Sequence, residues 1–404
     1  MLRNEVNRRF CFLTEFFDSA AALVRHYQVF YYLSDGAIEI YDPKNLCIFL
    51  KRIKIPTLSF KDLYKGNEVN IFSRLHKIVD YGDEYTKKYF EKTRSTTYGM
   101  IKPDGYMNIG KIIDLIYNRG GFTIGKLKLC KMSKENAAIF YGEHQGKPFY
   151  DFLIDYITSD FIVGMELIKE NAIKEWRNFI GPTNVEKAKK EAPNSLRALF
   201  GNGGKNTVHG SDSEASVKRE CALVFNKIRH VPSLTNCSCL VIKPHAIKDG
   251  NAGKIIDIIL SEGFEIYSMQ MFNIDKIQAE EFFQVYKGVL PEYSQMIDSM
   301  TCGPIIAMEV RQDDVVNKLR ALVGPQDPDI AKKLRPNTIR AKFGVSRVFN
   351  AVHCTDLQED AILECDYFFN KLANYKPDYW FICLVNKLWK YIIFIYLIYI
   401  FLFD

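Results

Sequence analysis

The sequence lacks the cysteine spacing that marks a zinc site or a dithiol redox motif. Its ten cysteines are scattered and contain no C-x-x-C pair, and only Cys237 and Cys239 lie close together. A signal-peptide pattern is also missing, because the early apolar stretch 10–24 is interrupted by Glu15 and Asp18. These features argue against a disulfide framework or a structural zinc site and favour a reducing compartment.

Strong charge and long apolar runs are scarce as well. A net charge of +6 spread over 404 residues hints only weakly at an acidic partner and does not indicate nucleic-acid binding. The longest apolar run, Tyr391 to Phe403, is shorter than the roughly 18 residues of a spanning helix. Residues 374–404 are therefore either a C-terminal membrane anchor or a gene-model extension outside the fold. Lys387 and Lys390 make a membrane anchor unlikely and favour the extension.

What the sequence does contain is organised around the stretch Asn206–Asp212, in which His209 is followed by a glycine, a hydroxyl and a carboxylate. A neutral imidazole is a competent nucleophile at cytosolic pH. Repeated attack requires that its other ring nitrogen be held by an acceptor, and Glu220 is the candidate. Taken alone, the stretch is equally consistent with a turn histidine beside a helix cap.

A second copy of this pattern decides between these interpretations. His353 stands in a similar stretch, with Glu364 eleven residues beyond it, as Glu220 is beyond His209. Further pairs recur in the same order: Lys102 with Lys243, Arg177 with Arg320, and Arg197 with Arg340. The offsets are 141 for the lysines, 143 for both arginine pairs and 144 for the histidines, which indicates a duplicated domain.

Two motifs of each copy resemble those of the nucleoside diphosphate kinase family. They are Ile101-Lys102-Pro103-Asp104-Gly105 near the start and Asn206-x-x-His209-Gly210-Ser211-Asp212 near the end of the first copy. The resemblance covers residues 93–230, the first kinase domain, and residues 234–373, the second. Two such domains behind an N-terminal module are similar to the axonemal, microtubule-associated branch of the family.

The N-terminal module is expected over residues 3–91. Short β-rich runs, separated by the turn signals Ser34-Asp35-Gly36 and Asp42-Pro43, predict a small all-β domain. Its later part, around Gly66-Asn67 and residues 79–83, resembles the DM10 domain of ciliary proteins. No catalytic constellation stands out in it, so a binding or packing module is the favoured interpretation.

Within each copy, strands and helices alternate. In the first, isoleucines 109, 112, 113 and 116 fall on one helical face, and Gly120-Gly121 ends that helix. The order β-α-β-α-β-α with a closing strand fits the ferredoxin-like sheet that the resemblance implies. The expected fold class is α+β, with two ferredoxin-like domains in tandem behind the β-rich module.

The first copy holds side chains suited to phosphoryl transfer. An ammonium at Lys102 and planar guanidinium groups at Arg177 and Arg197 match phosphate oxygens. Thr183 and Asn206 can donate to a phosphate and to a sugar hydroxyl, and a surface salt bridge is the alternative role for Arg177. By resemblance, the active-site positions are Lys102, Tyr141, Phe149, Arg177, Thr183, Arg197, Asn206 and His209.

The chemistry that the resemblance implies is a ping-pong transfer. His209 takes the γ-phosphate of a nucleoside triphosphate as a pros-phosphohistidine, and a nucleoside diphosphate then removes it. Mg²⁺ would be held by substrate phosphates and water without a protein carboxylate cage. Phe149 offers a flat face for a nucleobase, although a lone aromatic of this kind is more often part of a core.

The second copy departs from the family pattern. Phe283 stands where the family has tyrosine, Gln326 where it has threonine, and Cys354 where a glycine follows the histidine. The remaining counterparts are Lys243, Arg320, Arg340, Asn350 and His353. Cys354 would add strain if its position required a positive φ. In the first copy, the loop Asn184–Ser195 is also a few residues longer than the family's. The second site is expected to be weak or to serve as scaffold.

Two functions of different class follow. One is a working nucleoside diphosphate kinase whose first domain is active. The other is a structural, microtubule-associated protein of the axoneme that keeps the kinase fold with little required turnover. The resemblance implies nucleoside triphosphates and diphosphates as substrates. It implies tubulin or microtubules as partners, with the γ-tubulin ring complex as a further candidate. Expected locations are the cytoplasm and the cytoskeleton of the cilium axoneme or centrosome.

Overall fold

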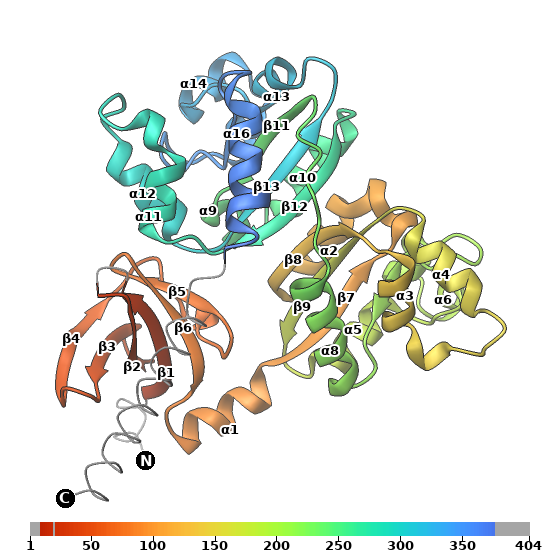
Figure 1. Cartoon of the computed structure of the whole chain (residues 1–404), viewed down its shortest axis with the longest axis horizontal. Coiled ribbons are helices and arrows are strands. Elements are labelled where there is room, and N and C mark those ends of the chain that lie inside the picture. The colour runs from red at the N-terminus through yellow and green to blue at the C-terminus, as the bar shows by residue number, and fades with distance from the viewer. Residues whose placement is uncertain (1–8, 19–20, 376–404) are drawn as a thin grey trace, which may run out of the picture. The chain divides into compact units, whose positions relative to one another are not determined.

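The structure, a computed structural model, describes residues 9–18 and 21–375 of the chain (Figure 1). By their contacts these residues form two compact units, the first made of the residues up to Asp83 together with Lys371–Tyr375 and the second spanning Glu84–Asn370. The connecting helix α1, Glu84–Thr93, thus belongs to the second unit and packs on β7. No helix within the described part of the chain is long and apolar enough to cross a membrane. The apolar tail expected over residues 374–404 lies almost wholly outside the described residues.

The first unit is one antiparallel sheet of six strands in the order β4-β3-β2-β1-β6-β5. The strands are β1 Arg9–Asp18, β2 Leu23–Tyr32, β3 Ala37–Asp42, β4 Cys47–Lys54, β5 Glu68–Ile71 and β6 Arg74–Tyr81. Alternation along β2 buries Tyr27, Val29 and Tyr31, as expected of a strand with one face on a core. The predicted β-rich module is confirmed, and β5 and β6 are strands that the turn signals did not reveal.

The second unit begins with a ferredoxin-like domain, here called domain A. Its strands are β7 Ser95–Ile101, β8 Thr123–Lys131, β9 Phe161–Lys169 and β10 Val208–Gly210. Its main helices are α2 Ile109–Asn118, α3 Lys134–Phe140, α4 Tyr150–Thr158, α5 Ala172–Ile180, α6 Val185–Glu191, α7 Leu196–Phe200 and α8 Glu214–Cys221. The strand order β10-β7-β9-β8, antiparallel throughout, places the first strand between the third and the last.

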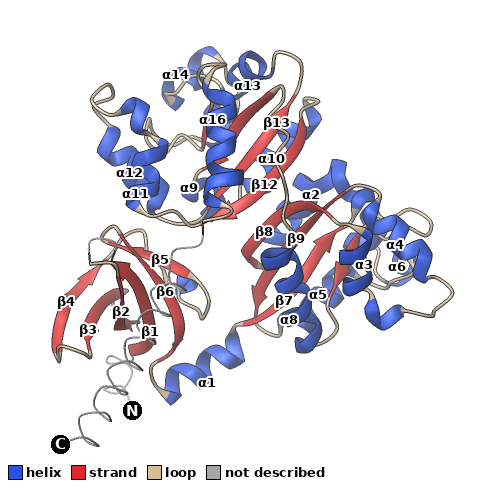
Figure 2. Cartoon of the chain, in the orientation of Figure 1, coloured by secondary structure: helices blue, strands red, loops and turns tan. Residues whose placement is uncertain are grey.

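Domain B repeats this architecture in the second half of the unit. Its strands are β11 Cys237–Ile242, β12 Glu265–Phe272, β13 Ile305–Arg311 and β14 Val352–Cys354. Its helices are α9 Pro244–Lys248, α10 Ala252–Ser261, α11 Lys276–Phe282, α12 Tyr293–Thr301, α13 Val315–Val323, α14 Pro328–Leu334, α15 Ile339–Phe343 and α16 Asp360–Asp366. The strands run β12-β13-β11-β14, and α16 lies across the face of this sheet (Figures 1 and 2). The expected tandem of ferredoxin-like domains is confirmed.

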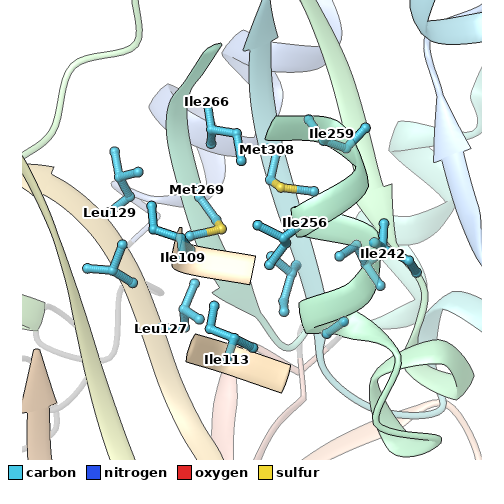
Figure 3. Packing of buried hydrophobic residues seen from close by; sticks show 14 of the residues in the cluster. Ile109, Ile113, Leu127, Leu129, Ile242, Ile256, Ile259, Ile266, Met269 and Met308 are labelled. Carbon is cyan, nitrogen blue, oxygen red and sulfur yellow. The ribbon is translucent and has the colours of Figure 1, made fainter. Parts of the chain in front are cut away.

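The two domains share one sheet and one core. β8 of domain A pairs antiparallel with β12 of domain B, which joins both sets of strands into a continuous eight-stranded sheet. Tyr106 bridges the domains as well, since its hydroxyl donates to the carbonyl of Ile266 (2.8 Å) and accepts from its amide (2.7 Å). Figure 3 shows isoleucines 109 and 113 of α2 converging with Ile256 and Ile259 of α10 in a single apolar cluster.

The crossing of α2 and α10 depends on two glycines in equivalent positions. A Cβ on Gly110 would come within 2.2 Å of the amide nitrogen of Asp257, and one on Gly253 within 2.2 Å of that of Asp114. Each glycine therefore lets the backbone of the opposite helix approach closely, which brings the isoleucine faces of both helices together.

We expect Gly110→Ala to destabilise the second unit by at least about 2 kcal/mol, because a methyl group cannot fit against the backbone of α10. Thermal unfolding of the full chain measures this. Helix propensity alone would predict that the variant is more stable than the parent, since alanine is favoured over glycine in a helix by about 1 kcal/mol. Gly204→Ala is the matched control, because nothing lies within 4 Å of its Cβ position. Equal melting temperatures for both variants and the parent would contradict the close crossing.

Candidate functional site

His209 lies on the short edge strand β10, paired with Met100 of β7. Its Nε2 is 3.1 Å from Oε2 of Glu220 on α8, and the hydroxyl of Ser211 donates to the same oxygen at 2.5 Å. The indole of Trp176 donates to the carbonyl of His209 at 3.1 Å and so fixes the backbone. Glu220 is in the position predicted for it, and the contact leaves Nδ1 of His209 without a partner in this arrangement.

Ser211 is a second residue that is hydrogen-bonded to Glu220, and no role was predicted for it from the sequence. Its counterpart Thr355 donates to Glu364 at 2.7 Å in domain B. A hydroxyl therefore follows each histidine by two residues in both copies, and that repeated hydroxyl was the available signal. With two donors on one oxygen, the Glu220 carboxylate is kept in one orientation toward the imidazole.

Aromatic rings form one wall of the site. Phe140 meets the His209 ring edge-to-face with 5.1 Å between centroids, and Tyr141 does so at 6.4 Å. Tyr141 is buried, which raises the pKa of its phenol. Tyr141 therefore contacts His209 through its ring, which restricts how the imidazole can turn.

The basic residues of the site gather where β7, α7 and β10 meet. The ammonium of Lys102, almost fully buried, donates to Oδ1 of Asn206 at 2.7 Å, and the amide of Asn206 donates to the carbonyl of Thr183 at 3.1 Å. Arg197 is buried too, and its guanidinium donates to the carbonyls of Val208 and Gly181 and to Thr183 Oγ1. Lys102, Thr183, Arg197 and Asn206 therefore belong to one constellation, as predicted.

The electrostatics of this cluster are those of an anion site. Burial lowers the pKa of Lys102 to about 8, with a further contribution from Arg197, while Asp104 raises it. Burial and the charge of Arg177 lower the pKa of Arg197 to about 10. Both side chains donate to neutral acceptors, and within the described chain neither forms an ion pair with a carboxylate. Positive charge is thus concentrated beside His209, which favours a bound anion such as phosphate.

Phe149 lies at the start of α4, away from this buried cluster. Its ring is 47% exposed, with the Lys147 ammonium 5.9 Å from its centroid and the His144 ring at 5.8 Å. An exposed ring of this kind is not a core residue, so the alternative role weighed for Phe149 does not apply. It provides the flat apolar face that a nucleobase requires.

The donor set does not form a metal cage. Among residues 9–18 and 21–375, no group of three or more His, Cys, Asp or Glu side chains could hold a metal ion. Asp212 is the carboxylate nearest in sequence to His209, and it accepts from Ser216 at 2.9 Å. A cationic cluster of this kind suits the phosphates that would carry Mg²⁺, and not the bare metal ion.

Domain B keeps the histidine–carboxylate pair but encloses it. His353 Nε2 lies 3.1 and 3.2 Å from the two oxygens of Glu364, and its side chain is 7% exposed, against 20% for His209. Phe283 packs on the ring with 5.5 Å between centroids. Tyr286 donates to Asp356 at 2.6 Å, and Asp356 also lies 3.9 Å from Arg320. Arg320, the counterpart of Arg177, is therefore paired with the carboxylate of Asp356.

The position of Phe149 is also changed in domain B, a difference not predicted from the sequence. Glu292 stands at the start of α12, as Phe149 does at the start of α4, and forms an ion pair with Arg347 at 2.9 Å. The loop between α11 and α12 is one residue longer than the loop between α3 and α4, so the correspondence of Glu292 with Phe149 follows from the positions of the helices. The site in domain B therefore lacks an exposed aromatic face at this point.

One expected penalty in domain B is wrong. Gly210 does not adopt a positive φ, so its counterpart Cys354 is not strained by its backbone. The glycine is needed for space, because a Cβ there would lie 2.5 Å from the Trp176 ring. Domain B has the smaller Leu319 at the position of that tryptophan, and Cys354 is accommodated in its core.

Comparison with known proteins shows which family the chain resembles. The nucleoside diphosphate kinase family model matches residues 95–229 and 236–373, the two ferredoxin-like domains. The nucleoside diphosphate kinase homolog 7 of Rattus norvegicus is 45% identical over 374 residues, 91% of this chain and 94% of that protein. The probable nucleoside diphosphate kinase 5 of Arabidopsis thaliana is 46% identical over 131 residues, 32% of this chain and 91% of that protein.

Among solved structures, the Aquifex aeolicus nucleoside diphosphate kinase is 33% identical, covers 34% of this chain and 97% of its own, and has a TM-score of 0.33. The family match extends over most of the chain and includes both histidine sites. The protein belongs to the nucleoside diphosphate kinase family.

Proposed function

We propose that the protein is a nucleoside diphosphate kinase that transfers the γ-phosphate of a nucleoside triphosphate to a nucleoside diphosphate through phosphohistidine at His209. The observation that carries the proposal is the buried cationic cluster of Lys102 and Arg197, which lacks a carboxylate partner and adjoins an imidazole held by Glu220. Phosphoryl transfer depends on positioning and on positive charge around the migrating group, and this cluster provides both.

The contact with Glu220 supports different roles for the two ring nitrogens of His209. Glu220 accepts from Nε2–H, so the lone pair on Nδ1 of His209 attacks the γ-phosphorus. An N–P bond forms, the bond from phosphorus to the β-phosphate oxygen breaks, and the nucleoside diphosphate leaves. The imidazole proton stays on Nε2, where the carboxylate stabilises the positive charge. A second nucleoside diphosphate reverses these steps through its terminal phosphate oxygen.

Substrate recognition divides between two parts of the site. Lys102, Arg177 and Arg197 bind the phosphates, and Mg²⁺ bound to those phosphates would neutralise part of their negative charge. Phe149 stacks on the base without reading its edges, which is consistent with broad base tolerance. Asn206 accepts from Lys102 and donates one amide hydrogen to the carbonyl of Thr183, which leaves its second amide hydrogen for a sugar hydroxyl.

A structural role associated with microtubules is the second candidate, and two observations favour it. Domain B keeps the fold while Tyr286 and Asp356 enclose its histidine site. The first unit is a β-sheet module separate from the catalytic domains, suited to binding another protein. Tubulin or microtubules of the cilium axoneme or centrosome are the proposed partners, with the γ-tubulin ring complex as a further one.

We expect His209→Ala to abolish phosphoenzyme formation while the fold is kept, because it removes the only histidine in domain A placed among the basic residues. The measurement is incubation with γ-labelled ATP and Mg²⁺, followed by a test for label that is lost in acid and kept in base. Retention of parental labelling by a folded variant would refute the assignment of His209.

The two histidine sites should differ strongly in turnover. A missing hydroxyl donor costs about 1–3 kcal/mol where it leaves a partner unpaired, so loss of the tyrosine and threonine donors slows transfer by roughly two to four decades. His353→Ala is the matched control for His209→Ala and should retain nearly all steady-state activity. Equal losses in the two variants would mean that both sites work.

Removal of the first unit should leave phosphoryl transfer largely unchanged and weaken co-sedimentation with microtubules. The division at Asp83 makes residue 84 the appropriate new start, since α1 belongs with the catalytic domains. Transfer activity and tubulin binding are measured on the same preparation. Loss of transfer with tubulin binding retained would reverse the assignment of roles.

A further inference from the structure

Asp104, two residues after Lys102, connects three separate segments of domain A. The phenol of Tyr156 on α4 donates to its Oδ1, and the hydroxyl of Thr207 donates to its Oδ2 at 2.7 Å. The carboxylate thus joins the loop after β7, the helix that begins at Phe149 and the turn before His209. We call these three residues, Asp104, Tyr156 and Thr207, the Asp104 tie.

Thr207 is held in a conformation that its side chain disfavours. Its φ is +59°, and the amide of Val208 bonds to the carbonyl of Asn206 at 2.6 Å, which makes a three-residue γ-turn. A β-branched residue at positive φ is rare and persists only where the surroundings enforce it. Thr207 is fully buried, and its hydrogen bond to Asp104 is one such enforcing contact.

The phosphate-binding residues depend on this turn. Asn206 is its first residue, and the carbonyl of Thr207 accepts from the amide of Lys102 at 2.7 Å. The Lys102 ammonium lies 5.3 Å from the centre of the Tyr156 ring, within the range of a cation–π contact, and donates to Asn206. All three members of the tie therefore contact Lys102, Asn206 or the backbone between Asn206 and His209.

Domain B offers an internal comparison, because it has lost the whole tie at once. His245, Ser299 and Ala351 stand at the positions of Asp104, Tyr156 and Thr207. Ala351 keeps the positive φ, at +71°, and is held instead by its amide, which donates to Nε2 of His245 at 3.1 Å. The turn is thus preserved in domain B without the side-chain tie.

The lysine and the asparagine are arranged differently in domain B. Lys243 donates to the carbonyl of Val348 at 3.0 Å, whereas Lys102 donates to the asparagine of its site. Oδ1 of Asn350 is buried and has no hydrogen-bond partner within the described chain. The lysine–asparagine pair is therefore formed in the domain that has the tie and absent in the domain that lacks it.

We propose that Asp104, through Tyr156 and Thr207, is a positioning residue that holds Lys102 and Asn206 in the arrangement required for phosphoryl transfer at His209. The inference rests on the proposed kinase activity of domain A and adds to it a connection between the base-binding and phosphate-binding parts of the site. Asp104 itself does not contact the reacting atoms.

The charge of Asp104 gives the proposal a second readout. Lys102 faces Asp104, Arg197 of α7, the ring of Tyr156 and, beyond that ring, Lys205. Asp104 raises the pKa of Lys102 against the lowering caused by burial and Arg197. Lys243, in whose case burial and Arg340 act without an opposing carboxylate, has a lower pKa of about 7. Lys102 is charged only below its pKa. Removing the Asp104 carboxylate should therefore lower that pKa, and phosphate binding should weaken at a lower pH than in the parent.

The test uses a matched pair of variants at Thr207. Thr207→Val keeps the shape and removes the hydroxyl, whereas Thr207→Ser keeps the hydroxyl. We expect Thr207→Val to lower kcat roughly tenfold or more with a smaller change in KM, and Thr207→Ser to restore most of the rate. Asp104→Asn should slow transfer and also move the alkaline limb of the pH–rate profile downward, which Thr207→Val should not do. Parental kinetics for Thr207→Val, or equally slow Val and Ser variants, would overturn the proposal.

Two further measurements separate this inference from the proposed activity. His245→Asn, the equivalent change in domain B, is the control and should leave turnover at His209 unchanged; a loss equal to that of Asp104→Asn would overturn the proposal. A nucleotide-free crystal structure of Thr207→Val should show Lys102 turned from Asn206 toward a main-chain carbonyl, as Lys243 is. An unchanged Lys102–Asn206 bond would refute the tie whether or not the parent protein transfers phosphate. Absence of labelling in the parent would instead refute the proposed activity.

Discussion

The burial of Lys102 and Arg197 near each other, with no carboxylate ion-paired to either among the residues that the structure describes, is the constraint on which the site in domain A depends. Removing charge from water is costly, and the lowered pKa values of Lys102 and Arg197 express that cost. Lys102 donates to the amide oxygen of Asn206, just before β10, and Arg197 donates to the carbonyls of Val208 on β10 and Gly181 after α5. Neutral acceptors orient the cations and leave their charge available, which a carboxylate would neutralise.

The two copies keep one fold but surround their histidines with different side chains. In domain A, Asp212 bonds to nearby serine hydroxyls, but the equivalent Asp356 in domain B is engaged by Tyr286 and faces Arg320. Replacements occur in compensating groups, as when Cys354 takes the place of a glycine and Leu319 that of a tryptophan. Packing is thereby preserved in domain B. The partial exposure of the histidine, the exposed aromatic ring at the position of Phe149 and the lysine–asparagine pair are found only in domain A.

Domain B also has a structural role, because it completes the core of domain A. The strand pairing of β8 with β12 removes an exposed sheet edge from each domain, and the crossing of α2 and α10 buries an isoleucine face of each helix. Tyr106, four residues after Lys102, bonds to the backbone of β12. The loop that carries Lys102 is therefore supported by domain B, so domain B contributes to the site that we propose to be active in domain A.

The sequence by itself determined the duplication, because the repeated landmarks are local patterns, and through its family resemblance it predicted the ferredoxin-like fold and the candidate site residues. Periodic isoleucines specify α2, and repeated motifs give His209, Lys102 and their counterparts in a fixed order. The pairing of His209 with Glu220 was also accessible, since a fixed spacing recurs in both copies.

Only the tertiary structure decided the relations that depend on distant segments. The chain places Asp104 and Thr207 far apart in sequence, and a γ-turn at a threonine has no local signal because its strain is held by that remote carboxylate. The need for Gly210 is likewise a matter of space beside Trp176 and not of backbone conformation. Local propensity specifies elements and motifs, whereas close packing between elements decides which side chains can work together.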